Sequence, residues 1–257
     1  KDGSIYINHG GTEMGQGLFI KVAQVVANEF GVEIERVKVS ATSTAKVPNT
    51  SPTAASSGSD LNGMAAREAC LRIKQNMSEF ALEHFDLSIG ELKFQDSCVL
   101  LGKKKITFDD FVSLSYLNRV ELFSNGFYKT PKIYFDAIKQ KGRPFYYYSY
   151  GSCVSEVLVD CLTGEYKLLA VDILYDVGAS LNPAIDMGQI VGGYIQGMGW
   201  LCSEELKWND SGVLLTTGAS TYKIPAIGDT PEHFEVKIKP NISNHENTIH
   251  KSKAVGE

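Results

Sequence analysis

The chain has 257 residues, of which 43% are hydrophobic and 21% are charged. This composition is typical of a soluble globular protein and excludes a disordered chain, and the length suffices for one large domain or two modest ones. The formal net charge is −5, which argues against a nucleic-acid-binding protein that relies on a broad basic face. Glycine is frequent, at 24 of 257 residues, compared with a usual share of about 7%.

The cysteines and histidines do not predict a protein-ligated metal site. The cysteines are odd in number and no two have the CxxC spacing, so a local zinc or iron–sulfur site is excluded and buried, reduced thiols are expected. The five histidines form no metal-spaced pair. No apolar run reaches the ~18 residues of a membrane-spanning helix. The sequence begins without Met or a signal peptide, and we expect it to be part of a longer chain.

The first segments of the chain predict a strand, a glycine-rich loop, a helix and a second strand. Alternating apolar residues over 4–8 predict the first strand, and glycines crowd residues 10–17. Apolar residues at helical spacing over 18–30 are followed by Gly31, where a helix commonly ends. Residues 37–39 predict the next strand.

A Ser- and Thr-rich loop then leads into a second predicted helix. Its apolar stripe runs over residues 61–80, with Ser59 or Asp60 as the N-cap. Residues 94–101 predict one strand, and a capping box predicts a further helix over 107–118.

Residues 124–150 are rich in aromatic side chains and also include a few basic ones. Aromatic residues beside lysines could bind single-stranded nucleic acid, but the basic residues are few, and we favour a segment that bridges two halves of the protein. The sequence therefore predicts two subdomains, at residues 1–125 and 126–257.

The second half mixes strands with a long helix. Residues 152–160 and 165–176 predict a β-hairpin. Asn182 followed by Pro183 predicts the start of a helix that runs to about Trp200. Further strands are predicted over residues 204–208, 213–216 and 234–239.

Two loops are candidate ligand sites. Backbone amides of the glycines at 10–17 could meet an anion at a helix N-terminus, and the Gln16 amide could meet the edge of a heterocycle. The spacing matches no dinucleotide or Walker motif, so a tight structural turn is the alternative. Small and hydroxyl-bearing residues over 49–60 suit a phosphate, and an ordinary capped connection is the alternative there.

The helix after Asn182 carries five glycines, each of which costs about 1 kcal/mol relative to Ala. Close helix packing or the close approach of a cofactor would explain them. Gln189 and Gln196 are one heptad apart and share a face, and the alternative is that both are surface residues. Glu257 at the end of the sequence is, by itself, typical of a solvated side chain.

Five segments, in this order, resemble the molybdenum subunit of xanthine dehydrogenases and aldehyde oxidases. They are GGTEMGQG at 10–17, NTSPTAAS at 49–56, NPAIDMGQ at 182–189, STYKIP at 220–225 and SKAVGE at 252–257. Residues 247–253 look most like bacterial xanthine dehydrogenase large subunits. The resemblance spans nearly the whole chain, which makes it far more specific than any single loop.

The resemblance implies an α+β fold with two molybdopterin-binding subdomains of mixed β-sheets packed with helices. It implies that Glu257 is the catalytic base. The metal would be held by the dithiolene sulfurs of the cofactor, so no protein ligands are expected. The implied cofactor-binding residues are Met14, Gly15, Gln16, Thr53, Ala55, Ser56, Ser57, Gly58 and Gln189.

The implied reaction is hydroxylation of xanthine or hypoxanthine at carbon with oxygen from water. FAD and 2Fe-2S clusters would lie on other domains or subunits, so the expected partners are the remaining half of the molybdenum subunit, an FeS/FAD subunit and a small N-heterocycle. Neither nucleic acid nor membrane is expected, and the location is predicted to be cytoplasmic. We expect the chain alone to be inactive. The alternatives are an aldehyde or N-heterocycle hydroxylase of the same family, or a non-catalytic assembly module.

Overall fold

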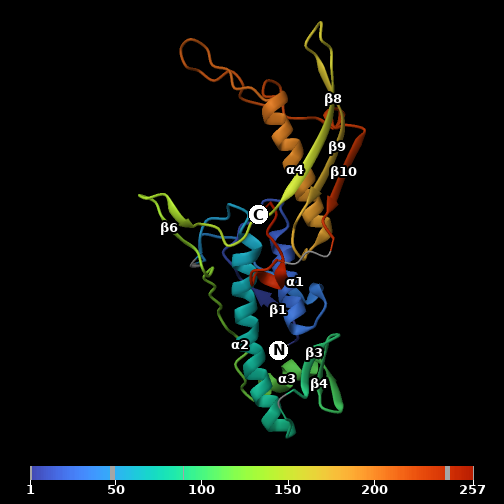
Figure 1. The fold of residues 1–257 in the computed structure, drawn as a ribbon. Helices are drawn as coiled ribbons and strands as arrows, with labels where there is room; N and C mark the ends of the chain where they lie inside the picture. The colour runs from blue at the N-terminus through green and yellow to red at the C-terminus, as the bar shows by residue number, and fades with distance from the viewer. Residues whose placement is uncertain (1, 47–49, 89, 241–243, 257) are drawn as a thin grey trace. The chain divides into compact units, whose positions relative to one another are not determined.

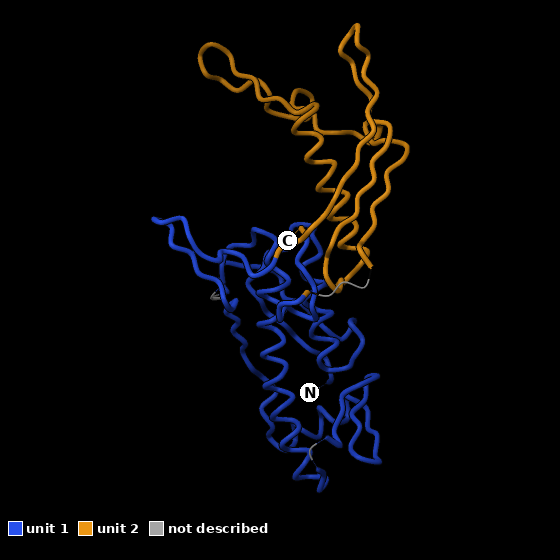
Figure 2. The backbone as a smooth tube through the Cα atoms, viewed as in Figure 1, with its two compact units in different colours: residues 1–147, 245–255, 257 blue, residues 148–244, 256 orange. Residues whose placement is uncertain are grey.

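Small sheets and four α-helices alternate in the computed structural model, which describes residues 2–46, 50–88, 90–240 and 244–256 (Figure 1). The chain divides into one unit of residues 1–147, 245–255 and 257 and a second of residues 148–244 and 256 (Figure 2). This mixture of helices with parallel and antiparallel strands confirms the predicted α+β class.

The compact units divide after Tyr147, and the subdomain division at 125/126 stays a prediction. Residues after 125 pack on the first unit: a Cβ added to Gly126 would stand 1.9 Å from the Ala65 carbonyl oxygen. This close approach of two backbone segments holds the bridging segment against helix α2 (Gly58–Phe85), so the first unit extends to Tyr147.

The first elements confirm the prediction. Strands β1 (Ile5–Ile7) and β2 (Val37–Val39) pair in parallel, with helix α1 (Leu18–Phe30) between them in the chain. The helix ends because Gly31 takes a left-handed φ of 61° and donates to the carbonyls of the last turn. The 3-10 helix η1 (Ile34–Arg36) leads into β2.

Helix α2 begins earlier than predicted. Ser57 is the N-cap, so the predicted caps Ser59 and Asp60 lie inside the first turn. Its buried face packs with that of α1 in a common apolar core, and Glu29 of α1 pairs with Arg67 of α2 at 2.9 Å.

The predicted single strand over 94–101 is wrong. The chain reverses at Asp96 and Ser97, which take left-handed φ values of 51° and 53° without any glycine to signal the turn. The result is the antiparallel sheet β3 (Leu92–Gln95), β4 (Cys98–Leu101) and β5 (Lys104–Thr107).

The helix predicted after Thr107 is present as α3 (Phe108–Leu117). The Thr107 hydroxyl accepts from the Asp110 amide at 3.1 Å and caps it. A short hairpin follows within the bridging segment, formed by β6 (Tyr134–Asp136) and β7 (Lys141–Arg143).

The second unit is built on the predicted hairpin, with β8 (Gly151–Val159) antiparallel to β9 (Tyr166–Tyr175). Strand β10 (His233–Ile238) pairs with β9 in parallel. Helix α4 (Pro183–Cys202) begins as predicted, because the Asn182 side chain accepts from the Ile185 amide at 3.1 Å.

The strands predicted over 204–208 and 213–216 are wrong. Only an isolated bridge joins Trp208 to Leu214. The remaining elements are the 3-10 helices η2 (Ile227–Asp229) and η3 (Ile249–Lys251).

Strand β8 is exposed along its whole length. The expected burial of the cysteines fails in this unit, where Cys153, Cys161 and Cys202 are exposed; in the first unit Cys70 is buried and Cys98 is half-buried. Among the described residues, no helix combines the length and the apolar character needed to cross a membrane.

Candidate functional site

The loop at 10–17 is held in shape by its own polar side chains. Gln16 is only 5% exposed; its side-chain oxygen accepts from the Met14 amide at 2.6 Å and its nitrogen donates to the Thr12 carbonyl at 2.8 Å. The Gln16 amide thus braces the loop in this structure. Met14 is 66% exposed, and a Cβ added to Gly15 would meet nothing within 4 Å. The predicted contact residues Met14 and Gly15 therefore lie at an accessible surface.

Glu13 occupies the N-terminus of helix α1. Its carboxylate accepts from the amides of Gly15 at 2.9 Å, Gly17 at 3.0 Å and Phe19 at 3.0 Å. Burial opposes ionisation of this carboxyl, but the backbone hydrogen bonds outweigh it and hold the Glu13 pKa below its ordinary value. The anion expected at this helix end is therefore the chain's own carboxylate. The position of Glu13 just before the start of a helix is the sequence signal that could have predicted this arrangement, because a carboxylate is stabilised there.

The second predicted segment lies beside the first. The Thr53 hydroxyl accepts from the Thr12 amide at 2.8 Å and so joins the two loops. Ala55 and Ser56 are exposed and both take left-handed φ values, 60° and 45°, which non-glycine residues adopt at a cost. Such consecutive turns of the backbone form concave surfaces that suit anions. Directly after them, Gly58 begins helix α2.

His9 contacts the backbone of the glycine-rich loop and helix α1. Its Nδ1 accepts from the Gly11 amide at 3.1 Å, and its ring packs edge-on against Phe19 with centroids 4.9 Å apart. Burial, followed by the nearby charge of Lys46, lowers the pKa of His9 to about 4. His9 is therefore neutral at pH 7 and able to accept this hydrogen bond.

We expect the stability of the chain to fall as the pH is lowered from 6.5 to 4. In this range the unfolded state takes up a proton on His9 that the folded state does not bind, which costs on the order of 3 kcal/mol by pH 4. Urea unfolding at pH 7 and pH 4.5 measures the change. His9→Gln should reduce the difference and the exposed-site control His84→Gln should not; an unaltered pH dependence in His9→Gln would contradict the assignment.

The glycines of α4 have two different explanations. A Cβ added to Gly199 would stand 2.2 Å from Glu204 Oε1 and 2.6 Å from Pro225 Cδ, so close packing requires this glycine. An added Cβ would meet nothing within 4 Å at the other four positions. These are Gly188, Gly192, Gly193 and Gly197. Packing among the described residues does not explain these four, which leaves room for the close approach of a ligand or of further polypeptide.

Gln189 of α4 lies against Gly256. A Cβ added to Gly256 would stand 2.2 Å from Gln189 Oε1, and Gly256 takes a left-handed φ of 70°. The structure thus brings the predicted cofactor-binding glutamine next to the residue that precedes Glu257. Glu257 itself lies outside the described residues.

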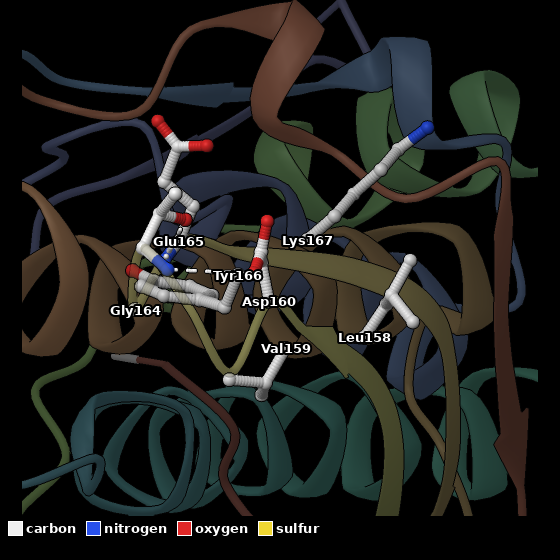
Figure 3. A pocket seen from close by; sticks show the side chains of 8 residues that line it. Leu158, Val159, Asp160, Gly164, Glu165, Tyr166 and Lys167 are labelled. Carbon is white, nitrogen blue, oxygen red and sulfur yellow. Dashed lines mark hydrogen bonds between the residues drawn. The ribbon is translucent and has the colours of Figure 1, made fainter.

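Two further features do not coincide with the predicted site. A shallow pocket at the tip of the β8–β9 hairpin, whose lining side chains Figure 3 shows, contains none of the predicted residues. Within the described part of the chain, Asp172, His233 and Glu235 could meet a cation. However, Asp172 pairs with His233 at 3.1 Å and Glu235 with Lys237 at 2.8 Å, so we assign no metal there.

Known proteins resemble the chain in sequence and in fold. It is 45% identical over 263 residues to xanthine dehydrogenase from Oryza sativa subsp. japonica, an alignment that covers 100% of this chain and 18% of that relative. The structure matches a Cu,Mo-CO dehydrogenase with a TM-score of 0.81 and 21% identity, over 98% of this chain and 31% of that chain. It matches aldehyde oxidoreductase from Desulfovibrio desulfuricans with a TM-score of 0.79 and 22% identity, over 99% of this chain and 25% of that chain.

These likenesses confirm different parts of the prediction. The structural matches, at such low identity, support the fold alone. The likeness of residues 247–253 to bacterial large subunits remains a prediction. The chain also matches the family described as the molybdopterin cofactor-binding domain over residues 1–231. Because this match extends over most of the sequence, the chain belongs to the family of molybdopterin cofactor-binding domains.

Proposed function

We propose that this chain is the part of a xanthine dehydrogenase molybdenum subunit that binds the molybdopterin and supplies the catalytic base. One observation carries the proposal: the hydrogen bond from Thr12 to Thr53 joins the two predicted cofactor loops in a chain of this family. The chain spans 18% of the length of its rice relative, which agrees with a part of a larger enzyme.

The described residues fit a pterin that carries a phosphate. Met14 and Gly15 offer an accessible apolar and backbone surface, and the left-handed turn at Ala55 and Ser56 offers a cradle for an anion. Gln189 adds an amide that can donate and accept, next to the residue before Glu257. Thr53, Ser57 and Gly58 complete the second loop, with Thr53 acting through its bond to Thr12. The bound cofactor would supply the two-electron redox chemistry that side chains lack.

The chain's own catalytic contribution would be a proton acceptor. Glu257 would take a proton from the attacking water-derived group. The loss of this proton would make the attacking oxygen more nucleophilic toward an electron-poor carbon next to a ring nitrogen. Xanthine or hypoxanthine is the proposed substrate, as part of purine catabolism in the cytoplasm. The proposed partners are the remaining half of the molybdenum subunit and an FeS/FAD subunit that receives the electrons. Without them, the isolated chain should be inactive.

The test compares the intact enzyme with the isolated chain. We expect the intact enzyme to contain molybdenum, measured by mass spectrometry, and to turn over xanthine and hypoxanthine faster than a panel of aldehydes. Preference for an aldehyde would favour the other hydroxylases of the family. Unchanged turnover in a Glu257→Ala enzyme would favour an assembly module. Stoichiometric molybdenum and xanthine-dependent dye reduction by the isolated chain would contradict its predicted inactivity.

A further inference from the structure

The segment that leads into Glu257 is buried and fastened. Ser252, Lys253, Ala254 and Val255 are 2%, 8%, 7% and 6% exposed. The Thr248 hydroxyl donates to the Ser252 carbonyl at 2.6 Å, and the Ser252 hydroxyl donates to the Ile249 carbonyl at 2.7 Å. These bonds close a tight turn over residues 248–252 of the first unit.

Tyr147 provides a fastening close to the end of this segment. Its hydroxyl accepts from the Ala254 amide at 2.7 Å and donates to a carboxylate oxygen of Asp60. A phenol has a single proton. Because this proton is donated in the hydrogen bond to Asp60, a lone pair of the Tyr147 oxygen is directed to the Ala254 N–H, and the two bonds strengthen each other.

Asp60 is well placed to orient the hydroxyl. It lies in the first turn of α2, where the helix dipole favours a negative charge, and it is 9% exposed. The segment is thereby connected to the same helix end that follows the predicted phosphate loop at Ala55 and Ser56. One helix terminus thus carries both the cofactor cradle and the anchor of the segment before Glu257.

Two further contacts hold the segment at positions farther from its end. The Tyr146 hydroxyl accepts from the Asn247 amide at 3.2 Å, and Glu246 pairs with Lys132 at 2.9 Å. An extended chain spans at most about 3.5 Å per residue. A hydrogen bond at Ala254 therefore leaves less unrestrained chain before position 257 than one at Asn247, which lies seven residues earlier.

We infer that Tyr147, oriented by Asp60, is a positioning residue that sets the location of the Glu257 carboxylate. The inference rests on the proposed function of Glu257 as the base. Tyr147 takes no part in proton transfer itself; it fixes the backbone at Ala254 so that Glu257 stays within reach of its proton donor. Its removal should lower turnover without reducing cofactor content, because the Tyr147 hydroxyl bonds to Asp60 and Ala254 and neither of them is a proposed cofactor-binding residue.

The test is Tyr147→Phe in the intact enzyme, with Tyr116→Phe as the control because it removes a hydroxyl from an exposed position on α3. We expect kcat to fall about 10- to 100-fold, with KM and molybdenum content unchanged. Amide hydrogen exchange of residues 248–257 should become faster in Tyr147→Phe and not in the control. Unchanged kcat and unchanged exchange, or a loss of molybdenum that accounts for the lower kcat, would overturn the inference.

A double-mutant cycle separates this inference from the proposed function. If Tyr147 acts through Glu257, Tyr147→Phe should have no further effect on kcat in a Glu257→Gln enzyme. An equal loss in both backgrounds would overturn the inference while leaving Glu257 as the base. If Glu257→Gln alone keeps the wild-type kcat, the proposed function fails first. Asp60→Asn keeps an acceptor oxygen and should lower kcat by a smaller factor than Tyr147→Phe. This variant replaces Tyr147→Phe in the test if Tyr147→Phe folds poorly.

Discussion

Glu257→Gln should reduce kcat of the intact enzyme about a thousandfold. An amide has nearly the shape of a carboxylate but cannot take up a proton at neutral pH, so the variant keeps substrate contacts and loses the base. KM and molybdenum content should therefore stay near the wild-type values. Steady-state kinetics with xanthine, corrected for the measured metal content, gives the comparison.

Glu232→Gln is the matched control, because Glu232 is an exposed carboxylate that lies outside the proposed site. Its kcat should equal that of the wild-type enzyme. A Glu257→Gln enzyme with wild-type turnover would exclude Glu257 as the base and would favour the assembly-module alternative.

Gly31→Ala should strongly reduce stability, with a loss of about 4 kcal/mol. Gly31 takes a left-handed φ of 61°, and an added Cβ would stand 2.6 Å from Gln95 Cα and from the Phe94 carbonyl. These are backbone atoms of β3, and they cannot rotate away as a side chain can. The Gly31 carbonyl also accepts from the Ser97 amide at 2.7 Å, so any shift of the loop breaks a second contact with the sheet. Urea unfolding measures the loss.

Gly102→Ala separates the two causes of this loss. Gly102 has nearly the same φ, 60°, but an added Cβ would meet only the side chains of Glu91 and Leu87, both at 3.4 Å. Its expected cost is therefore about 1–2 kcal/mol, from the backbone conformation alone. Equal losses in the two variants would show that the approach of β3 to Gly31 is not the cause.

The elements that sequence predicted best are those fixed by local chemistry. Helix α1 has the predicted bounds because its apolar spacing and Gly31 act within a few residues. Helix α4 starts as predicted because Asn182 and Pro183 act on the first turn. The turn at Asp96 and Ser97 could not be predicted because neither residue is a glycine. Their left-handed conformation is stabilised by the pairing of β3 with β4 on either side of the turn.

The candidate site divides in the same way. Its two loops could be predicted because short motifs carry them, and the structure joins them through Thr12 and Thr53. The bonds of Tyr147 could not be predicted, because its partners Asp60 and Ala254 are 87 and 107 residues away in the chain. A local sequence pattern cannot predict such pairs, because only the folded chain brings their residues together. For that reason the central tyrosine of the run at 146–148 first indicated only an aromatic bridging segment.

The molybdenum-to-protein ratio of a Ser56→Asp enzyme tests the central claim most directly. Ser56 is exposed and left-handed, a conformation that Asp tolerates better than most residues. The variant should therefore fold while its added negative charge repels a phosphate from the cradle. We predict a ratio near one in the wild-type enzyme and in the exposed control Ser211→Asp, and a ratio at least about tenfold lower in Ser56→Asp. A folded Ser56→Asp enzyme with a full complement of molybdenum would contradict the proposal that this chain holds the cofactor at residues 53–58.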